Sequence, residues 1–274
     1  SQPSSSPGES RVALRRALVT LIVTILGLLA WQLAQEYRQL LDSQRQLHQA
    51  YATQLARHLS QSMSLKAQTV QVILQSREVA SEGFDQRIGN LREVFPTLSS
   101  VAWFDSNGQL RADSAGPSRD QAFIRQLLRH NASHDYHYAF SPREGGTLYL
   151  LLRQPDDSHH VLRLQPQVLD DWLRDQERGE HQWLLEDRLS QRVIARADDA
   201  PRTGFSATPV TAAEQAHSLE AFALSGSDWQ LRALFDAERA GNQLMPALAG
   251  KFLLFILCSL LTLLALYGLQ REQR

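Results

Sequence analysis

The chain has 274 residues, a formal net charge of -1 at pH 7 and 43% hydrophobic residues. These values are those of an ordinary soluble protein, and no basic patch with interleaved aromatic residues points to a nucleic acid partner. The apolar residues are, however, concentrated in two uncharged runs at residues 17–34 and 252–269.

A long helical pattern follows the first run. Residues 17–34 carry no charge and can cross a bilayer, since about 20 helical residues cover a hydrocarbon core of about 30 Å. Beyond them, apolar residues recur at helical spacings, and no Gly or Pro interrupts residues 31–76. We therefore predict transmembrane helix 1 at 17–34 and a periplasmic stalk helix with its connection at 35–90. The apolar stripe of the stalk could pack against the domain's own sheets or against a second copy.

The Ser- and Pro-rich start of the chain, residues 1–16, is predicted to be a disordered cytoplasmic tail. The second run predicts transmembrane helix 2 at 252–269, preceded by an exit helix at 237–251. A buried core helix is the alternative for either run, but two runs of spanning length, each flanked by Arg or Lys, disfavour it.

Short flanking charges predict the orientation of the spans. Arginines lie on the terminal side of both runs: Arg11, Arg15, Arg16, Arg271 and Arg274. Both termini are therefore expected in the cytoplasm, residues 35–250 outside, and residues 270–274 at the start of a cytoplasmic region.

The sequence between the runs changes to a strand pattern. An apolar, β-prone run at 101–104 precedes Asn107-Gly108, which is the strongest short-range hairpin signal because both residues tolerate positive φ. An amphipathic helix, three strands and a second helix follow, which gives a first module at 91–178. Two strand–turn–strand units separated by a loop give a second, shorter module at 179–236.

This order of elements resembles the double Cache sensor domains of bacterial receptors. The matching stretches are VAWFDSNGQLRADS, VLRLQPQVLDDWL, QWLLEDRLSQRVIAR and SGSDWQLRALFD. The resemblance implies an α+β fold, with two transmembrane helices flanking an exterior domain made of a long N-terminal stalk helix and two PAS-like antiparallel-sheet modules. It also implies a homodimer in the bacterial inner membrane, whose membrane-distal module holds a small ligand and whose membrane-proximal module usually holds none.

One departure from the family bears on the ligand. Amino-acid-sensing members carry an Arg-x-Trp-Tyr type signature in the distal module. The comparable stretch here, AFIRQLLRHNASHDYHY, lacks it. This departure argues against an α-amino acid as the ligand.

Six residues of the first module are candidates for ligand contact. Small carboxylates need cationic or hydroxyl donors that converge in a mostly apolar pocket. The candidates are Trp103, Arg125, Tyr136, Tyr138, Arg143 and Arg153. Tyr136 and Tyr138 are two apart on a predicted strand, so they face the same side of it. The alternative for the aromatic residues is a core position with a polar tip at the surface.

Histidines offer a further pattern. His130, His134 and His137 would suit one helical face as metal ligands or as a pH sensor. Residues 131–133 are predicted to end the helix, however, and residues 135–138 have an extended pattern. Solvated loop histidines are therefore the preferred interpretation, and neither a metal site nor a cofactor is predicted. No Gly-x-Ser-x-Gly elbow, phosphate-binding Gly-rich loop or His-Glu-x-x-His helix indicates catalysis.

These features predict a transmembrane signal-transduction receptor segment that senses a small periplasmic ligand. The signal would pass through the membrane helices to a cytoplasmic output domain beyond this sequence: a cyclic-di-GMP enzyme, a two-component histidine kinase or a chemoreceptor signalling domain. Whether the whole protein is an enzyme depends on that domain. The alternative is a membrane-anchored periplasmic domain that binds another envelope protein.

Overall fold

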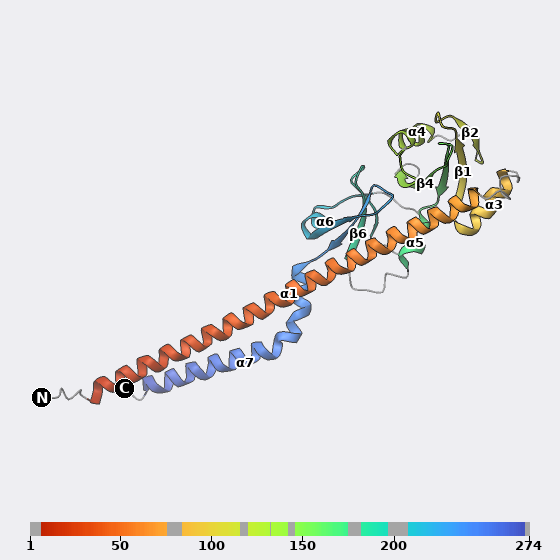
Figure 1. The fold of residues 1–274 in the computed structure, drawn as a ribbon. Helices are drawn as coiled ribbons and strands as arrows, with labels where there is room; N and C mark the ends of the chain where they lie inside the picture. Colours follow the sequence, from red (N-terminus) through yellow and green to blue (C-terminus); the bar gives the residue numbers. More distant parts are fainter. Residues whose placement is uncertain are drawn as a thin grey trace. The chain divides into compact units, whose positions relative to one another are not determined.

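A computed structural model describes residues 7–75, 84–115, 120–131, 133–141, 146–174, 182–196 and 208–271 (Figure 1). It divides into two compact units, Ser1–Gln46 with Asp236–Arg274, and Leu47–Phe235. The predictions for residues 1–6 and for the part of the connection at 76–83 lie outside the described residues.

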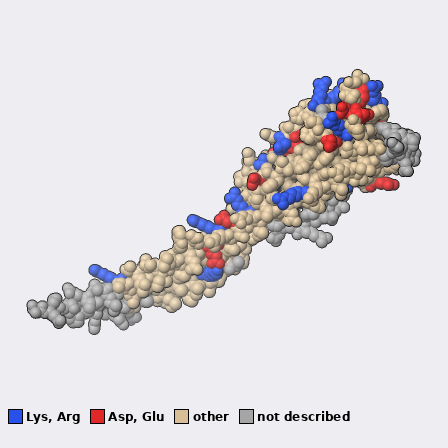
Figure 2. All heavy atoms as spheres, viewed as in Figure 1, with Lys and Arg blue, Asp and Glu red and all other residues tan. Residues whose placement is uncertain are grey.

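The first unit contains the N-terminal part of helix α1 (Pro7–Gln75) and all of helix α7 (Ala237–Arg271). Helix α1 begins within residues 1–16, for which the sequence predicts disorder. This start is physically reasonable because proline suits the first position of a helix, where its missing N–H has no intrahelical partner to lose. Figure 2 shows few charged side chains over this unit.

The two helices differ as candidate membrane spans. Among the described residues, the helix from Arg16 to Gln75 is by length and composition able to cross a membrane on its own. Helix α7 is long and apolar enough to cross a membrane only if its two parts, Ala237–Pro246 and Leu248–Leu264, are counted as one span. The axes of the two parts differ in direction by 70°. The bend falls between these two parts, next to Pro246, whose nitrogen cannot donate to the helical ladder. The second span remains a prediction.

Close contacts join α1 and α7 inside this unit. Lys251 pairs with Glu36. Gly241 lies so near Tyr37 that an added Cβ would be 2.4 Å from the tyrosine oxygen. Gly241 therefore leaves room on α7 for the Tyr37 hydroxyl in its observed position.

The second unit contains two antiparallel sheets. The first sheet has the strand order β2-β1-β5-β4-β3. Its strands are β1 (Leu98–Phe104), β2 (Leu110–Asp113), β3 (Tyr136–Ser141), β4 (Thr147–Arg153) and β5 (His159–Leu164). Its helices are α3 (Phe84–Val94), α4 (Gln121–His130) and α5 (Gln167–Arg174). The predicted hairpin at Asn107-Gly108 joins β1 to β2, and Gly108 has a φ of 72°.

The second sheet has the strand order β8-β7-β6-β10-β9. Its strands are β6 (Gln182–Asp187), β7 (Arg192–Arg196), β8 (Thr208–Pro209), β9 (Ser218–Ala223) and β10 (Trp229–Leu234). The short helix α6 (Ala212–His217) lies in the segment predicted to be a loop. Its N-terminus is a capping box between Thr211 and Glu214, a sequence signal of a helix start that was missed.

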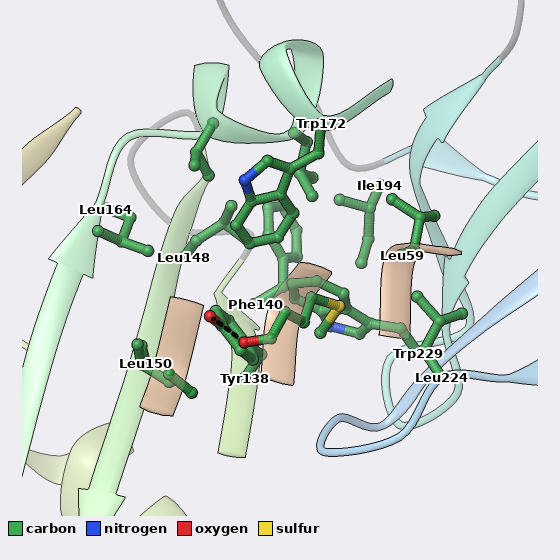
Figure 3. Packing of buried hydrophobic residues seen from close by; sticks show 14 of the residues in the cluster. Leu59, Tyr138, Phe140, Leu148, Leu150, Leu164, Trp172, Ile194, Leu224 and Trp229 are labelled. Carbon is green, nitrogen blue, oxygen red and sulfur yellow. Dashed lines mark hydrogen bonds between the residues drawn. The ribbon is translucent and has the colours of Figure 1, made fainter. Parts of the chain in front are cut away.

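The core lies between α1 and both sheets. Buried residues of α1, including Leu59 and Met63, pack with Tyr138 of the first sheet and Trp229 of the second (Figure 3). The dashed line in Figure 3 is the hydrogen bond that the Tyr138 hydroxyl donates to the Met63 carbonyl over 3.1 Å. The apolar stripe of the long helix therefore packs against the domain's own sheets. An α+β fold with a long N-terminal helix and two antiparallel sheets is confirmed.

Candidate ligand-binding site

The first sheet has two differently used faces. One face packs on α1 through apolar residues such as Leu148, Leu150 and Leu162. The other, which we call the outer face, is covered by α4 through Ile124 and Leu127. Because side chains alternate along a strand, the residues between those leucines point to the outer face.

A row of polar residues crosses the outer face. Arg163 on β5 is the register partner of Ser100 on β1 and of Tyr149 on β4. Cross-strand partners on one face lie close enough to interact. The register therefore brings three polar side chains together in a sheet whose other buried positions are mostly apolar.

The centre of this row is a buried ion pair. Arg163 Nη2 lies 3.2 Å from Asp113 Oδ2, and the two side chains are 11% and 3% exposed. Arg163 Nη1 also donates to Ser100 Oγ over 3.1 Å. The Nε of Arg163 is buried and has no hydrogen-bond partner among the described residues. A buried, unused donor of a charged group is costly unless something else accepts from it.

Tyr149 extends the cluster to the start of α4. Its hydroxyl donates a short hydrogen bond to Asp120, the residue that precedes the helix. Burial, together with that carboxylate, raises the pKa of Tyr149, so the phenol remains a donor at any physiological pH. We call Ser100, Asp113, Asp120, Tyr149 and Arg163 the outer-face cluster.

The cluster has the chemistry of a small-molecule site. Buried ion pairs contribute little to stability compared with apolar residues of the same shape. The cluster offers a cationic donor, a neutral phenol and two carboxylates, which can orient a small polar ligand.

A hollow lies beside α4, on the side of the β1–β2 turn. It has a volume of about 590 Å³, and its walls include Arg125, Arg129, Asn107 and His159. Arg125 and Arg129 are one helical turn apart, exposed, and without an ion-pair partner in the described part of the chain. Two like charges on one helix face destabilise the helix slightly, and they favour an anion in this hollow.

The five predicted residues that the structure describes do not lie around one site. Arg125 lines the hollow beside α4, and Arg143 lies outside the described residues. Trp103 is partly exposed and stacks on His160, with ring centroids 6.4 Å apart. Arg153 is half-exposed and pairs with Asp157 at 2.5 Å.

The two tyrosines face one side of β3 and contact each other, with ring centroids 6.2 Å apart. That side is the one that packs on α1. Tyr138 is fully buried there. The two tyrosines therefore lie on the opposite side of the sheet from Arg125 and the outer-face cluster.

The histidines form no described metal site. His130 and His134 are exposed, whereas His137 is buried on β3. Burial lowers the pKa of His137, partly offset by Asp228 nearby. No group of three or more His, Cys, Asp or Glu side chains among the described residues could hold a metal ion.

The outer-face cluster was not predicted from the sequence. A signal was present in the segment LRL, where Arg163 lies between two leucines of a predicted strand. A charged residue at an alternating position of a buried strand requires a partner. The identity of that partner, Asp113, depends on the pairing of distant strands and cannot be read from local sequence.

Comparisons with known proteins give only distant likenesses. No family model matches the chain, and no curated protein matches it. The ligand-binding domain of the Pseudomonas fluorescens chemoreceptor CtaA, solved with L-isoleucine, is 10% identical and has a TM-score of 0.48. That match covers 75% of this chain and 96% of the other. These values describe similarity of fold only.

Two further structures are similar. An extracellular ligand binding receptor from Desulfohalobium retbaense is 13% identical with a TM-score of 0.41, over 68% of this chain and 39% of the other. The periplasmic domain of Vibrio cholerae LuxQ is 13% identical with a TM-score of 0.36. That match covers 74% of this chain and 98% of the other. Both likenesses are of fold only.

Proposed function

We propose that the chain is the sensing segment of a transmembrane signal-transduction receptor. It binds a small ligand in the module built on the first sheet, the predicted membrane-distal module at 91–178. It crosses the bacterial inner membrane twice, with both termini in the cytoplasm and residues 35–250 in the periplasm. A cytoplasmic output domain beyond this sequence, such as a cyclic-di-GMP enzyme, a histidine kinase or a chemoreceptor domain, receives the signal. The receptor acts as a homodimer.

The outer-face cluster is the observation that carries this proposal. The Arg163–Asp113 pair is buried on the outer face of the first sheet, and one donor of its guanidinium has no described partner. An additional acceptor, such as a ligand carboxylate or carbonyl, would complete the hydrogen bonding of Arg163. Arg125, on the exposed side of α4, would attract an anionic ligand to the same module.

A route from the ligand to the long helix supports signalling. The outer face of the first sheet holds the cluster, and the opposite face of the same strands packs on α1. A ligand that binds one arrangement of the sheet and α4 more tightly than another shifts the population of those arrangements. Because protein interiors are close-packed, the shift also changes the contact with α1. The helices are then the parts of this chain that would carry the change across the membrane.

Ligand-induced stabilisation tests the proposal. The whole chain, held in detergent micelles, is heated with small carboxylates, amino acids, amines and divalent metals, and unfolding is followed by tryptophan fluorescence. A ligand that binds the folded state raises the unfolding midpoint by mass action. The expected result is a hit that is lost in the double variant Asp113→Leu with Arg163→Met. This double variant removes the ion pair without leaving one charge buried alone.

A matched pair in the second sheet serves as the control. Arg232 Nε lies 2.8 Å from Glu186 Oε2 in a similar strand-to-strand ion pair. The double variant Glu186→Gln with Arg232→Met should keep the hit. A panel with no shift, together with recovery of an envelope protein by cross-linking, would overturn the ligand-sensing proposal in favour of partner binding. A hit that survives loss of the Asp113–Arg163 pair would place the ligand elsewhere.

A further inference from the structure

A second hollow lies where the two sheets meet. It has a volume of about 420 Å³, within the usual range for small-molecule sites. Helix α4 and strand β3 form one side of it, and the β6–β7 and β9–β10 turns form the other. We call it the junction hollow. It is separate from the outer-face cluster, none of whose residues lines it.

The junction hollow contains a mostly buried carboxylate that pairs with no cation of the described residues. Asp187, at the end of β6, is 5% exposed and lines the hollow. Its Oδ2 accepts from the Ser190 amide over 3.0 Å and from the Ser190 hydroxyl over 2.6 Å. Within the described residues, its Oδ1 has no hydrogen-bond donor, and no Arg, Lys or His side chain pairs with it. This oxygen is accessible from the hollow, where a cationic ligand can pair with it.

The other carboxylate of the hollow is already compensated. Asp228 Oδ1 lies 3.5 Å from Arg188 Nη2, and its Oδ2 lies 3.2 Å from His137 Nε2. Despite this short distance, His137 Nε2 and Asp228 Oδ2 do not have the geometry of a hydrogen bond. Of the two carboxylates that line the hollow, Asp187 is the one without an ion-pair partner among the described residues.

The walls of the hollow favour an organic cation over a metal ion. Phe123 and Leu127 of α4 and Leu189 of the β6–β7 turn contribute apolar surface. A divalent metal would need several oxygen or nitrogen ligands, and no such group exists among the described residues. An alkyl or aryl body suits the apolar wall, and an ammonium group is attracted by a carboxylate and by an aromatic ring.

We propose that the junction hollow binds a small organic amine, with its ammonium group on Asp187 and its apolar body against Phe123 and Leu189. Leu189 is 65% exposed at the rim, and the bound body would cover it. Because both sheets line the hollow, the amine strengthens their contact. This proposal is independent of a ligand at the outer-face cluster.

Benzylamine is the probe, and benzyl alcohol is its uncharged match in shape. Binding to the whole chain in detergent micelles is measured by calorimetry and by the unfolding midpoint. Benzylamine is expected to bind and to raise the midpoint, whereas benzyl alcohol at the same concentration does neither. Asp187→Asn keeps an acceptor for Ser190 but removes the charge, so it should weaken benzylamine binding about tenfold or more.

Two further variants sharpen the test. Asp156→Asn is the matched control, because Asp156 also accepts from a serine amide and hydroxyl in a turn, those of Ser158, but does not line the hollow. It should bind benzylamine as the unmodified chain does. Leu189→Lys changes an exposed residue, so folding is expected to be kept. Its ammonium group competes for Asp187 and should also weaken binding about tenfold.

Several results would overturn the proposal. They are no benzylamine binding, equal binding of benzyl alcohol, or unchanged affinity in either Asp187→Asn or Leu189→Lys. The double variant Asp113→Leu with Arg163→Met separates the two sites. It should lose ligands of the outer-face cluster and keep benzylamine, and loss of benzylamine in this variant would contradict an independent site.

Discussion

The backbone N–H of Tyr138 donates a hydrogen bond of 2.7 Å to the carbonyl oxygen of Gly226. Tyr138 lies on β3, the edge strand of the first sheet, and Gly226 lies in the β9–β10 turn of the second sheet. An otherwise open strand edge is thereby paired across the junction. Gly226 has a φ of 73°, and an added Cβ would lie 2.1 Å from Cε2 of Tyr136.

Gly226→Ala is therefore expected to destabilise the folded chain. The substitution forces a side chain into a left-handed conformation and against the Tyr136 ring, which together should cost about 2–4 kcal/mol. Chemical denaturation of the whole chain in micelles, followed by tryptophan fluorescence, measures the change in the free energy of unfolding.

Gly108→Ala is the matched control for this prediction. Gly108 has nearly the same φ of 72°, but nothing lies within 4 Å of its added Cβ. Gly108→Ala should therefore lower the free energy of unfolding by only about 1 kcal/mol, the cost of placing alanine in a left-handed backbone conformation. Adding Tyr136→Ala to Gly226→Ala should recover part of the loss. Equal costs at the two glycines would show that the ring does not restrict this position.

The hydroxyl of Tyr138 is expected to stabilise the contact between the first sheet and α1. Tyr138→Phe removes the hydrogen bond to the Met63 carbonyl and leaves the buried ring in place. The expected loss is about 1 kcal/mol, which lowers the unfolding midpoint by about 2–4 °C for a domain of this size. Tyr136→Phe is the control, because the Tyr136 hydroxyl has no hydrogen bond to any described residue. A similar shift in both variants would contradict a specific role for the Tyr138 bond.

Local patterns were enough to predict much of the fold. Helical spacing of apolar residues and the absence of Gly and Pro predicted the long helix that is observed as α1. The hairpin at Asn107-Gly108 followed from residues that tolerate positive φ, and Gly108 adopts it. The early start of α1 at Pro7 and the helix α6 were missed, although both have recognised N-terminal signals, a proline and a capping box.

The candidate site could not be predicted in the same way. Alternation along β3 places Tyr136 and Tyr138 on one side, but it does not say whether that side packs on α1 or on α4. The Arg163–Asp113 pair joins strands β5 and β2 across β1. Asp187 and α4 come together only when the two sheets dock. Such contacts depend on register and packing between distant segments, which a single sequence does not encode locally.

The outer-face ion pair gives a third prediction. Arg163→Met alone leaves Asp113 buried beside no cation, and it should cost about 3–5 kcal/mol. Adding Asp113→Leu removes that uncompensated charge, so the double variant should recover most of the loss. The free energy of unfolding in denaturant is measured for both single variants and the double variant. Additive losses would mean that the two side chains are not coupled in the folded protein.

The capping box of α6 gives a prediction about pH. The hydrogen bond from Arg196, which lies 2.6 Å from Glu214, lowers the pKa of Glu214 from its ordinary value of 4.5 to about 2. A carboxyl whose pKa is lowered by folding stabilises the folded state at pH above 4.5. It loses that contribution as the pH falls toward 2. Stability that depends on this carboxylate should therefore disappear between about pH 4.5 and pH 2.

Glu214→Gln tests this dependence. At pH 7 it should cost about 1–2 kcal/mol, since it removes a charged acceptor from Arg196 and from the helix cap. The difference between the unmodified chain and the variant should then shrink as the pH is lowered through 4.5, as measured by denaturation at pH 7, 4 and 2.5. Glu93→Gln, on an exposed position of α3, should show no such difference. A cost for Glu214→Gln that is the same at all three pH values would mean that Glu214 acts through its shape and not through its charge.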